Sequence, residues 1–392
     1  MADPAVPARL LDLTRLVSRI GRGPLTGVDR VEAAYLTELL RRDGPMFALV
    51  RTAAGFLLLD RAGAQGVAAL VAGATPGPAD LLSRLTNRDA MRGQAEASVR
   101  RLAIARAAVP LLGRLLARVP QGATYLNVGH ANLSDRTLAR LHRRCRIAVL
   151  VHDTIPLDFP QFSRPDTVDS FARKLASVAT HADLVIHTTQ ATRRATDPHL
   201  RRAGRVPPGV VAALGVPCPQ PDPTTPRPPG RYFVALGTVE PRKNHALLLQ
   251  VWTDLGPDAP TLLVIGGRGW ADPQLFDRLA ATPGVQLLSG LSDGAVAHLL
   301  QGAAALLFPS LAEGFGLPPV EAAALGTRVV ASDLPALREV LGDYPIYLAA
   351  TDSYSWSETI KTLRSDLPSR RNPTAFTPPS WEDHFNTVLS LV

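Results

Sequence analysis

The stretch LFPSLAEGFGLPPVEAAALG, residues 307–326, contains in succession the patterns of a strand, a loop and a helix. Its apolar start stops at Pro309, and a glycine-rich loop follows. Pro318 and Pro319 then lead into an Ala-rich run. Proline is tolerated in the first turn of a helix because the N–H that it lacks would have no partner there. The stretch therefore predicts the strand–loop–helix unit from which α/β domains are built.

Two acids, Glu313 and Glu321, flank this loop eight residues apart. Gly314 and Gly316 let the backbone approach a ligand closely, and the free amides at a helix start favour an anion. A carboxylate accepts two hydroxyl hydrogen bonds at once, which suits the vicinal diol of a sugar. The pattern predicts a ligand with sugars on both sides of a phosphate. For Glu321 the alternative is a charge that merely complements the helix dipole.

Short apolar runs alternate with helical patterns along the rest of the chain. The strand candidates are residues 46–50, 55–60, 124–129, 147–153, 183–189, 210–216, 231–238, 261–267, 284–290, 305–310 and 327–333. Helical patterns such as 166–182 and 244–255 lie between many of them. Strands that are apolar on both faces and alternate with helices indicate parallel sheets covered on both sides.

A proline-rich segment, CPQPDPTTPRPPG at residues 218–230, separates two halves of similar size. It holds six prolines, and proline continues neither a helix nor a sheet. We expect one α/β domain over residues 1–217, a linker over 218–230 and a second α/β domain over 231–375. Residues 376–392 end in a helical pattern with Ser380 as its N-cap.

The composition of the 392 residues is that of a globular protein, with 46% apolar residues and a net charge of +8. No run reaches the roughly 18 apolar residues of a membrane span, and the N-terminus lacks the order of a signal peptide. Two cysteines, Cys145 and Cys218, cannot form a disulfide framework, so we expect a cytoplasmic protein. No zinc-finger spacing, RNP motif or recognition helix accompanies the basic charge, which argues against nucleic acid as a partner.

Five arginines interleave with apolar side chains in SVRRLAIARAAVPLLGRLLARVP, residues 98–120. Basic amphipathic helices can lie on anionic membranes, so this segment suggests a peripheral contact with the inner face of a membrane. The alternative is a core-packed helix with arginines on its outer face. Pro110 interrupts the pattern.

A second motif, GTVEPRKNHALLL at residues 237–249, places two cations between a strand candidate and a helical pattern. Asn244 lies where an N-cap is expected. Arg242 and Lys243 beside a helix N-terminus would hold a phosphate group well, because the free amides and the helix dipole add to their charge. The alternative is a solvated basic turn.

Polar residues also follow the strand candidates of the first half. His130 follows one run, His152 and Asp153 end the next, and His187 ends another. In open parallel sheets, ligands bind beyond the carboxyl ends of the strands. Two such edges that face each other would form one interdomain cleft.

Three stretches, GTVEPRKNH, FPSLAEGFGLPPVEAAALG and VVASDLPALREVLGD, together resemble the retaining nucleotide-sugar glycosyltransferases of family four. The resemblance is close over residues 231–345 and weaker in the first half. It implies the GT-B fold, in which two Rossmann-like parallel-sheet domains face each other across a cleft. The first domain would bind the acceptor and the second the nucleotide sugar, and the last helix would pack back toward the first domain.

The resemblance also implies roles for single residues. Lys243 would contact the donor diphosphate, with help from Arg242. Glu321 would hold the ribose hydroxyls, and Glu313 would lie beside the transferred sugar. The implied catalytic residues are His152, Glu313 and Lys243, and the implied donor-binding residues are Gly27, Gly237, Arg242, Lys243, Gly316, Leu317 and Glu321.

In the first half, GRGPLTGVDRVEAAYL at residues 21–36 resembles the acceptor loop of the family, in which glycines approach the phosphates. This points to Gly27 and, less directly, to Arg30. VHDTIP resembles the family's His-Asp pair, whose histidine reaches a hydroxyl of the donor sugar, which corresponds to His152. His130 stays open as the competing histidine.

No Asp-x-Asp occurs in the chain, and metal-dependent glycosyltransferases need such carboxylates to hold a divalent ion. We therefore expect no metal, with protein cations and helix dipoles stabilising the leaving group. The absence of Gly-x-Gly-x-x-Gly argues against a dinucleotide enzyme. Many members carry a further arginine shortly before the lysine, where this chain has Gly237 and Thr238.

The sequence thus leads to the expectation of a hexosyltransferase that needs no cofactor. The donor would be a nucleoside diphosphate sugar, with GDP-mannose as a first guess, and the acceptor a hydroxyl of a polysaccharide or lipid-linked glycan. Two alternatives remain, a nucleotide-sugar epimerase of the same fold and a non-catalytic nucleotide-sugar or membrane-binding protein. The complete set of acids and the lysine argue against the second.

Overall fold

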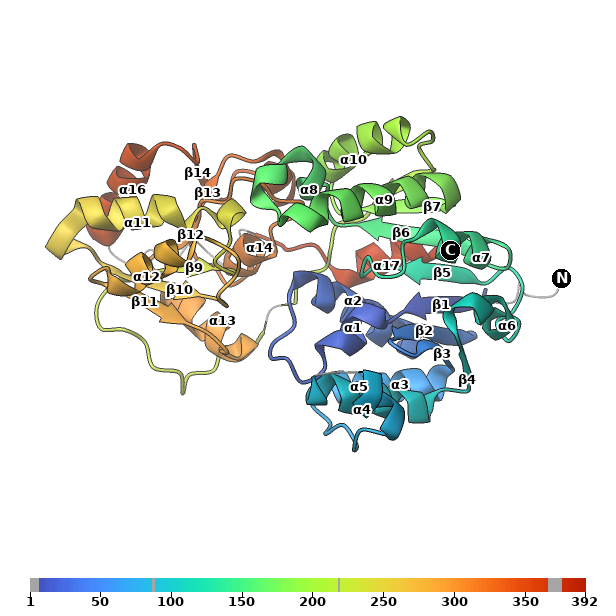
Figure 1. The fold of residues 1–392 in the computed structure, drawn as a ribbon. Coiled ribbons are helices and arrows are strands. Elements are labelled where there is room, and N and C mark those ends of the chain that lie inside the picture. The colour runs from blue at the N-terminus through green and yellow to red at the C-terminus, as the bar shows by residue number, and fades with distance from the viewer. Residues whose placement is uncertain (1–6, 87–88, 218, 366–375) are drawn as a thin grey trace.

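The computed structural model describes residues 7–86, 89–217, 219–365 and 376–392. They form two α/β domains that lie side by side, each built on one open sheet (Figure 1). The first sheet has the strand order β4-β3-β2-β1-β5-β6-β7-β8, and the second has the order β11-β10-β9-β12-β13-β14. The fold class expected from the sequence is therefore confirmed.

The elements of the first domain alternate along the chain. Its strands are β1 (Arg9–Asp12), β2 (Met46–Thr52), β3 (Gly55–Leu59), β4 (Ala105–Ala107), β5 (Thr124–Asn127), β6 (Arg146–Val151), β7 (Leu184–His187) and β8 (Gly209–Val211). Its helices are α1 (Thr14–Arg19), α2 (Gly27–Arg41), α3 (Arg61–Val71), α4 (Leu81–Thr86), α5 (Ala90–Leu102), α6 (Leu112–Leu116), α7 (Asp135–His142), α8 (Ile155–Asp158), α9 (Pro165–His181) and α10 (Gln190–Arg202).

The second domain repeats this plan on a smaller scale. Its strands are β9 (Tyr232–Leu236), β10 (Thr261–Ile265), β11 (Val285–Leu288), β12 (Leu306–Phe308), β13 (Val329–Ser332) and β14 (Ile346–Leu348). After a 3-10 turn, η3 (Pro241–Lys243), its helices are α11 (His245–Leu255), α12 (Pro273–Ala281), α13 (Asp293–Gly302), α14 (Leu317–Ala324), α15 (Pro335–Leu341) and α16 (Ser353–Ser365). The last helix of the chain is α17 (Trp381–Leu389).

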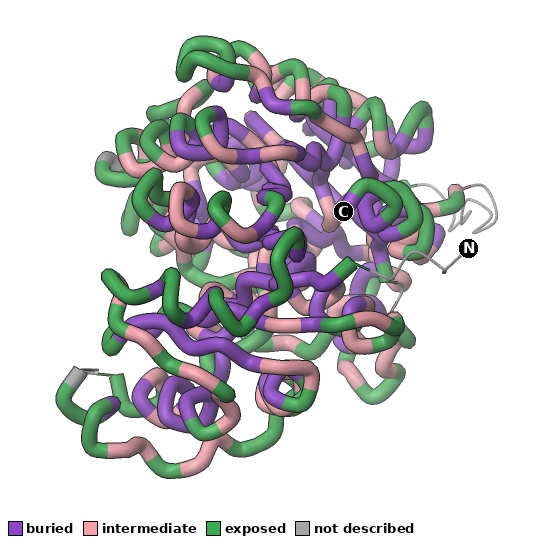
Figure 2. Tube along the Cα trace, turned by 90° about the vertical axis from the view of Figure 1, so that its right-hand side faces the viewer, coloured by how far each residue is buried: buried purple, intermediate pink, exposed green. Residues whose placement is uncertain are grey.

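Each sheet is apolar on both faces, as the strand patterns predicted. In β1, Leu10 and Leu11 point to opposite faces and join two separate buried clusters, and Val149 and Leu150 in β6 do the same. The buried residues form the interior of both domains, with exposed residues on the outer helices (Figure 2). Helices on both faces are what this pattern requires.

Strand β1 is missing from the sequence-based prediction, although it lies at the centre of the first sheet between β2 and β5. Its four residues, RLLD, are all buried. The strand is too short to show a period, and α1 begins two residues after it, so the run resembles part of a helix. The pairs β2–β3 and β3–β4 are antiparallel, so this edge also departs from the all-parallel sheet that was expected.

The basic segment 98–120 does not form the amphipathic helix considered above. It is divided among the end of α5, the edge strand β4 and the short helix α6. Arg100 is 5% exposed and forms an ion pair with Asp80 at 2.5 Å. Arg100 and Arg101 lie in α5, Arg106 lies in β4 and Arg114 lies in α6. The interpretation of this segment as one amphipathic helix is therefore wrong.

Helix α17, shown in red in Figure 1, lies against the first domain although it follows the second in sequence. Ser380 caps it by accepting a hydrogen bond from the Asp383 amide at 3.0 Å, as predicted. The Arg9 guanidinium at the start of β1 donates to the Leu389 and Val392 carbonyls at 3.4 and 3.3 Å. The C-terminus is thus built into the core of the first domain.

The two chain segments that cross between the domains touch each other. The Val216 amide donates to the Pro379 carbonyl at 3.1 Å. A Cβ on Gly215 would lie 2.2 Å from the Trp381 backbone nitrogen, so only glycine allows this approach. Farther along, the Asp222 amide donates to Gly294 at 2.9 Å, so the proline-rich segment lies along the second domain.

A neutral histidine holds α17 in place. His384 Nδ1 lies 3.0 Å from the Ala213 carbonyl, so this nitrogen carries the proton. Its Nε2 must then accept from the Tyr35 hydroxyl at 2.8 Å. Burial lowers the pKa of His384 to about 4, more than the hydrogen bonds to Ala213 and Ala212 raise it. Protonation in the folded state would force the Tyr35 hydroxyl to accept from Nε2 instead of donating to it, and would place a charge at a buried position.

The lowered pKa of His384 predicts that this residue alone makes the folded protein less stable in acid. The folded-state pKa of about 4 is below the ordinary 6.5, so the unfolded chain binds the proton more readily and stability falls as the pH drops below 6.5. At pH 5 the loss is about 2 kcal/mol. Urea unfolding at pH 7 and pH 5 should show a smaller loss in His384→Gln than in the wild type, whereas His142→Gln at an exposed site should behave like the wild type. Equal losses in all three proteins would contradict the assignment.

Candidate functional site

A cleft of about 810 Å³ separates the two domains at the carboxyl ends of their strands. Its first-domain wall consists of α1, the loop after it, the start of α2 and the loop after β6. Its second-domain wall consists of the loops after β9, β10, β11 and β12, helix α13 and the first turns of α14. Among the residues implied by the resemblance, those that line the cleft are Gly27, His152, Gly237, Arg242, Lys243, Glu313, Gly316, Leu317 and Glu321.

Four charged side chains form one cluster on the second-domain wall. Arg242 lies 2.6 Å from Glu240 and 2.8 Å from Glu313, and Lys243 Nζ lies 2.5 Å from the same Glu313 oxygen. Lys243 also lies over the Phe308 ring at 4.5 Å. The turn that presents both cations is not a solvated one, because Lys243 is 9% exposed.

The charges within this cluster determine its protonation. Burial would raise the pKa of Glu313, but the charges of Arg242 and Lys243 outweigh burial and lower it to about 2. Burial lowers the pKa of Lys243, and Glu313 opposes that shift. Burial raises the pKa of Glu240 against the charge of Arg242. The cluster therefore presents Lys243 and Arg242 as cations, each already in contact with a carboxylate.

Backbone geometry makes room for the lysine. Gly237, at the end of β9, has φ = 145°, and a Cβ there would lie 3.4 Å from Lys243 Cε. A Cβ on Gly266 would lie 2.1 Å from the Gly237 carbonyl oxygen. Asn244 adopts φ = 54° and its side chain donates to the Ala350 carbonyl at 2.9 Å, so it does not cap α11 as expected.

The start of α14 faces the same cleft. Gly316 is its N-cap residue, with φ = 88°, in the left-handed region that favours glycine. Pro318 and Pro319 carry no N–H, so the first amides available near this turn belong to Gly316 and Leu317. The expected helix start with its two prolines is confirmed.

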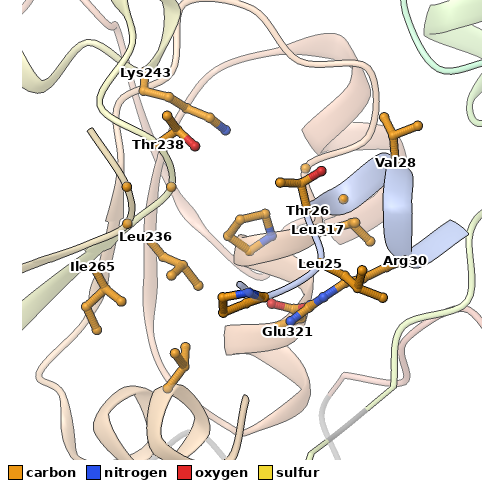
Figure 3. A pocket seen from close by; sticks show the side chains of 18 of the residues that line it. Leu25, Thr26, Val28, Arg30, Leu236, Thr238, Lys243, Ile265, Leu317 and Glu321 are labelled. Atoms are coloured by element: carbon orange, nitrogen blue, oxygen red, sulfur yellow. The ribbon is translucent and has the colours of Figure 1, made fainter. Parts of the chain in front are cut away.

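Glu321 is held by an arginine of the other domain. Arg30 Nη1 lies 2.6 Å from Glu321, and Arg30 Nη2 contacts Asp293 of α13. Burial raises the pKa of Glu321, and the Arg30 charge opposes this. Figure 3 shows Arg30 and Glu321 pointing toward each other at the opposite side of the pocket from Lys243. The structure thus gives Arg30 a partner that the sequence did not indicate.

The two competing histidines lie together, and one of them lines the cleft. His152 Nε2 donates to the Val128 carbonyl at 2.7 Å, and His130 Nε2 donates to the Leu150 carbonyl at 2.8 Å. The ring centroids are 5.1 Å apart. Burial lowers the pKa of His152 to about 4 and that of His130 to about 3. Both imidazole rings are therefore neutral at pH 7. Of the two histidines, His152 is the one that lines the cleft.

Further residues that line the cleft were not predicted from the sequence. Arg15 and Arg19 share the buried Asp29 at 2.7 and 3.2 Å, and Asp29 also forms a capping box with Thr26 at the start of α2. The apolar residues Leu236, Ile265, Leu291, Val296 and Leu300 line the end of the cleft near Glu321. The Thr-x-x-Asp spacing at 26–29 was a readable signal for a helix start, whereas the apolar lining carries no local signal.

Comparison with known proteins finds similarity to glycosyltransferases in the sequence of part of the chain. Residues 221–376 match the family model "Glycosyl transferases group 1". The O-antigen chain mannosyltransferase RfbU of Salmonella typhimurium is 35% identical over 149 residues, which is 36% of this chain and 41% of that protein. The MMP alpha-(1->4)-mannosyltransferase of Mycolicibacterium hassiacum is 45% identical over 101 residues, 26% of this chain and 22% of that protein. These matches span less than half of either relative.

The solved structures extend the similarity to the whole fold. The crystal structure of Anabaena Alr3699/HepE in complex with UDP and glucose covers 98% of this chain and 95% of its own, with a TM-score of 0.59 and 14% identity. The crystal structure of TarM covers 74% of this chain and 57% of its own, with a TM-score of 0.52 and 13% identity. The two facing parallel-sheet domains are thus a GT-B fold.

Proposed function

We propose that the chain is a retaining, metal-independent glycosyltransferase that moves a hexose from a nucleoside diphosphate sugar to a hydroxyl of a polysaccharide or lipid-linked glycan. The observation that carries this proposal is the buried cluster of Arg242, Lys243 and Glu313 in the interdomain cleft, opposite His152. It combines cations for a leaving diphosphate with an acid and a neutral histidine for a sugar. The match of the second domain to group 1 glycosyltransferases supports it.

The donor can be placed on the second-domain wall. Lys243, Arg242 and the amides of Gly316 and Leu317 would bind the diphosphate, since helix starts and cations favour phosphate. Glu321 would accept hydrogen bonds from the ribose hydroxyls, and the base would contact the apolar end of the cleft. To bind Glu321, the ribose hydroxyls would have to compete with Arg30, because Arg30 and Glu321 already form an ion pair at 2.6 Å.

We propose mannose as the transferred sugar and GDP-mannose as the first donor to test. Several relatives are named as mannosyltransferases, among them RfbU and the MMP alpha-(1->4)-mannosyltransferase. The acceptor would enter along the first-domain wall, near Gly27 and the loop before α2. No cofactor is needed for this reaction.

The chain's own groups would supply positioning and charge stabilisation. As the bond from the sugar to the diphosphate breaks, Lys243 and Arg242 would stabilise the negative charge that develops on the leaving oxygen. The acceptor hydroxyl would attack from the same face, and the leaving phosphate would take its proton. The free Nδ1 of neutral His152 would accept a hydrogen bond from a sugar hydroxyl and orient the ring.

A contact with an anionic membrane is a further part of the proposal. Helix α4 exposes Leu81 by 74% and Leu85 by 77%, with the cation Arg84 between them. The ion pair between Arg22 and Asp89 joins the loop that lines the cleft to the start of α5 beside this patch. Apolar insertion flanked by positive charge suits an anionic bilayer. None of the described helices is both long and apolar enough to cross a membrane.

The decisive test of transfer is a release assay with a panel of nucleotide sugars, with and without glycan acceptors. Lys243→Ala should lower the transfer rate by about 30- to 1000-fold, because a charge-assisted contact in the transition state is worth about 2–4 kcal/mol. Activity should survive excess EDTA. Loss of activity in EDTA with rescue by Mn²⁺ or Mg²⁺ would refute a leaving group stabilised by protein cations, and release without any acceptor would favour the epimerase.

Substitutions of Glu321 and Glu313 should have different effects on nucleoside diphosphate binding and on turnover. Glu321→Gln should weaken nucleoside diphosphate binding by about 10- to 150-fold, since a hydrogen bond to a charged group is worth about 1.5–3 kcal/mol. Glu313→Gln should keep or improve that binding, because Lys243 and Arg242 lose a competing carboxylate, while turnover falls. Calorimetry with GDP and UDP beside initial rates measures both. Asp293→Asn, which also loses an Arg30 contact, is the control, and equal weakening by all three substitutions would contradict the division of roles.

The membrane contact is tested with lipid vesicles. Leu81→Ser with Leu85→Ser should reduce co-sedimentation with vesicles that contain phosphatidylglycerol, because the apolar side chains that would insert are lost. Tyr354→Ser on the second domain is the control, since Tyr354 is also 73% exposed. Equal binding of all variants to these vesicles would refute the role of α4, and binding that persists on phosphatidylcholine alone would refute the role of charge.

A further inference from the structure

The loop that carries Glu313 is held by side chains of the opposite domain. The hydroxyls of Thr188 and Thr189 lie 3.1 Å from the Gly314 carbonyl oxygen, and that of Thr192 lies 2.9 Å from it. All three threonines are buried. A carbonyl oxygen has two lone pairs, so it accepts from two of these hydroxyls at a time. One carbonyl beside Glu313 is therefore fixed by the strand end and helix start at β7 and α10.

Glycine is required at this point because the backbones of the two domains meet there. A Cβ on Gly314 would lie 2.2 Å from the His152 carbonyl oxygen and 2.9 Å from Asp153 Cβ. No flexible side chain can yield at the closer contact, since it is made by backbone. The loops that present Glu313 and His152 to the cleft are thus packed directly on each other.

A second contact between the domains lies at the start of the same helix. Glu339 of α15 accepts hydrogen bonds from the backbone amides of Gln190 at 2.6 Å and Ala191 at 3.0 Å. A helix start leaves its first amides without partners within the helix, and a carboxylate there is favoured by the helix dipole. The Thr189 hydroxyl oxygen accepts a hydrogen bond from the next amide, that of Thr192, at 2.9 Å. Two of the first amides of α10 are therefore satisfied by the other domain.

We propose that Glu339 and the threonines 188, 189 and 192 form a closure clasp that fixes the Glu313 loop against the first domain. The clasp consists of a buried part, the hydroxyls on Gly314, and an exposed part, the carboxylate on the α10 amides. When the domains separate, both parts lose their partners together, and the Glu313 loop loses its contact with the His152 loop. These residues are positioning residues, and their role in turnover depends on the proposed glycosyl transfer.

The clasp should affect the placement of Glu313 without affecting nucleoside diphosphate binding, unlike the donor-binding residues. Glu339 and the threonines contact the Gly314 carbonyl and the helix α10 amides rather than Lys243 or Glu321. Nucleoside diphosphate binding to the second domain should therefore be independent of them. The placement of Glu313 relative to His152 should depend on them, because these groups belong to different domains.

The experiment uses Glu339→Ala and the double variant Thr188→Val/Thr192→Val in the full chain. The double variant leaves the Gly314 carbonyl only the hydroxyl of Thr189. Small-angle X-ray scattering should show a larger radius of gyration for both variants than for the wild type. The turnover number should fall about tenfold, while the dissociation constants of GDP and UDP stay within about twofold, because a loss confined to turnover reflects placement of the reacting groups rather than ground-state binding. Thr188→Ser/Thr192→Ser keeps both hydroxyls and should behave like the wild type. Asp333→Asn removes an exposed acid just before α15 whose partner is Arg338, within the same domain, and is the matched control.

Gly314→Ala provides an independent variant, because its Cβ would collide with the His152 backbone and hold the cleft open. An unchanged radius of gyration in all clasp variants would overturn the clasp. A larger radius with an unchanged turnover number would overturn the positioning role, and a parallel loss of nucleotide binding would assign these residues to the donor site instead. If the wild type transfers no sugar, the proposed function fails, whereas the scattering result still decides whether the clasp exists.

Discussion

Glu313 is the buried anion on which the second-domain wall of the cleft depends. Arg242 and Lys243 are both largely withdrawn from water, and a buried cation without a counter-charge costs several kcal/mol. One carboxylate oxygen contacts both cations, so Glu313 balances their charge from within the protein itself. The diphosphate of the proposed donor would bring a second source of negative charge to the same place. The site is thus stable before binding and electrostatically prepared for an anion.

The cleft is completed by contacts between domains rather than by either domain alone. Arg30 reaches from α2 to Glu321 near its apolar end, and the threonines before and within α10 reach Gly314 near Glu313. Glu321 and the loop that carries Glu313 are therefore each in contact with a residue of the opposite domain. Any relative movement of the domains changes the environment of both acids at once.

The sequence predicted those parts of the fold and site that depend on local chemistry. Apolar runs on both sides of the proline-rich segment predicted the two sheets. The glycines, prolines and acids of residues 307–326 predicted the start of α14 and the loop before it. Strand β1 was missed because four buried residues show no period. The Arg30–Glu321 pair joins residues 291 positions apart, and no local pattern encodes such a contact. Gly314 was attributed to ligand approach, yet its immediate neighbour is the His152 backbone.

The position of α17 has a consequence for the order in which the protein is made. The helix contributes Phe385, Val388 and Leu389 to the buried apolar cluster that includes the first-domain residues Tyr35 and Leu39, but it follows the second domain along the chain and leaves the ribosome after it. The first domain therefore emerges early without one of its helices, and its surface around Tyr35 is exposed until the second domain has been synthesised. Folding of the two domains is therefore coupled in time as well as in space, because the first domain is complete only after the second domain has been synthesised.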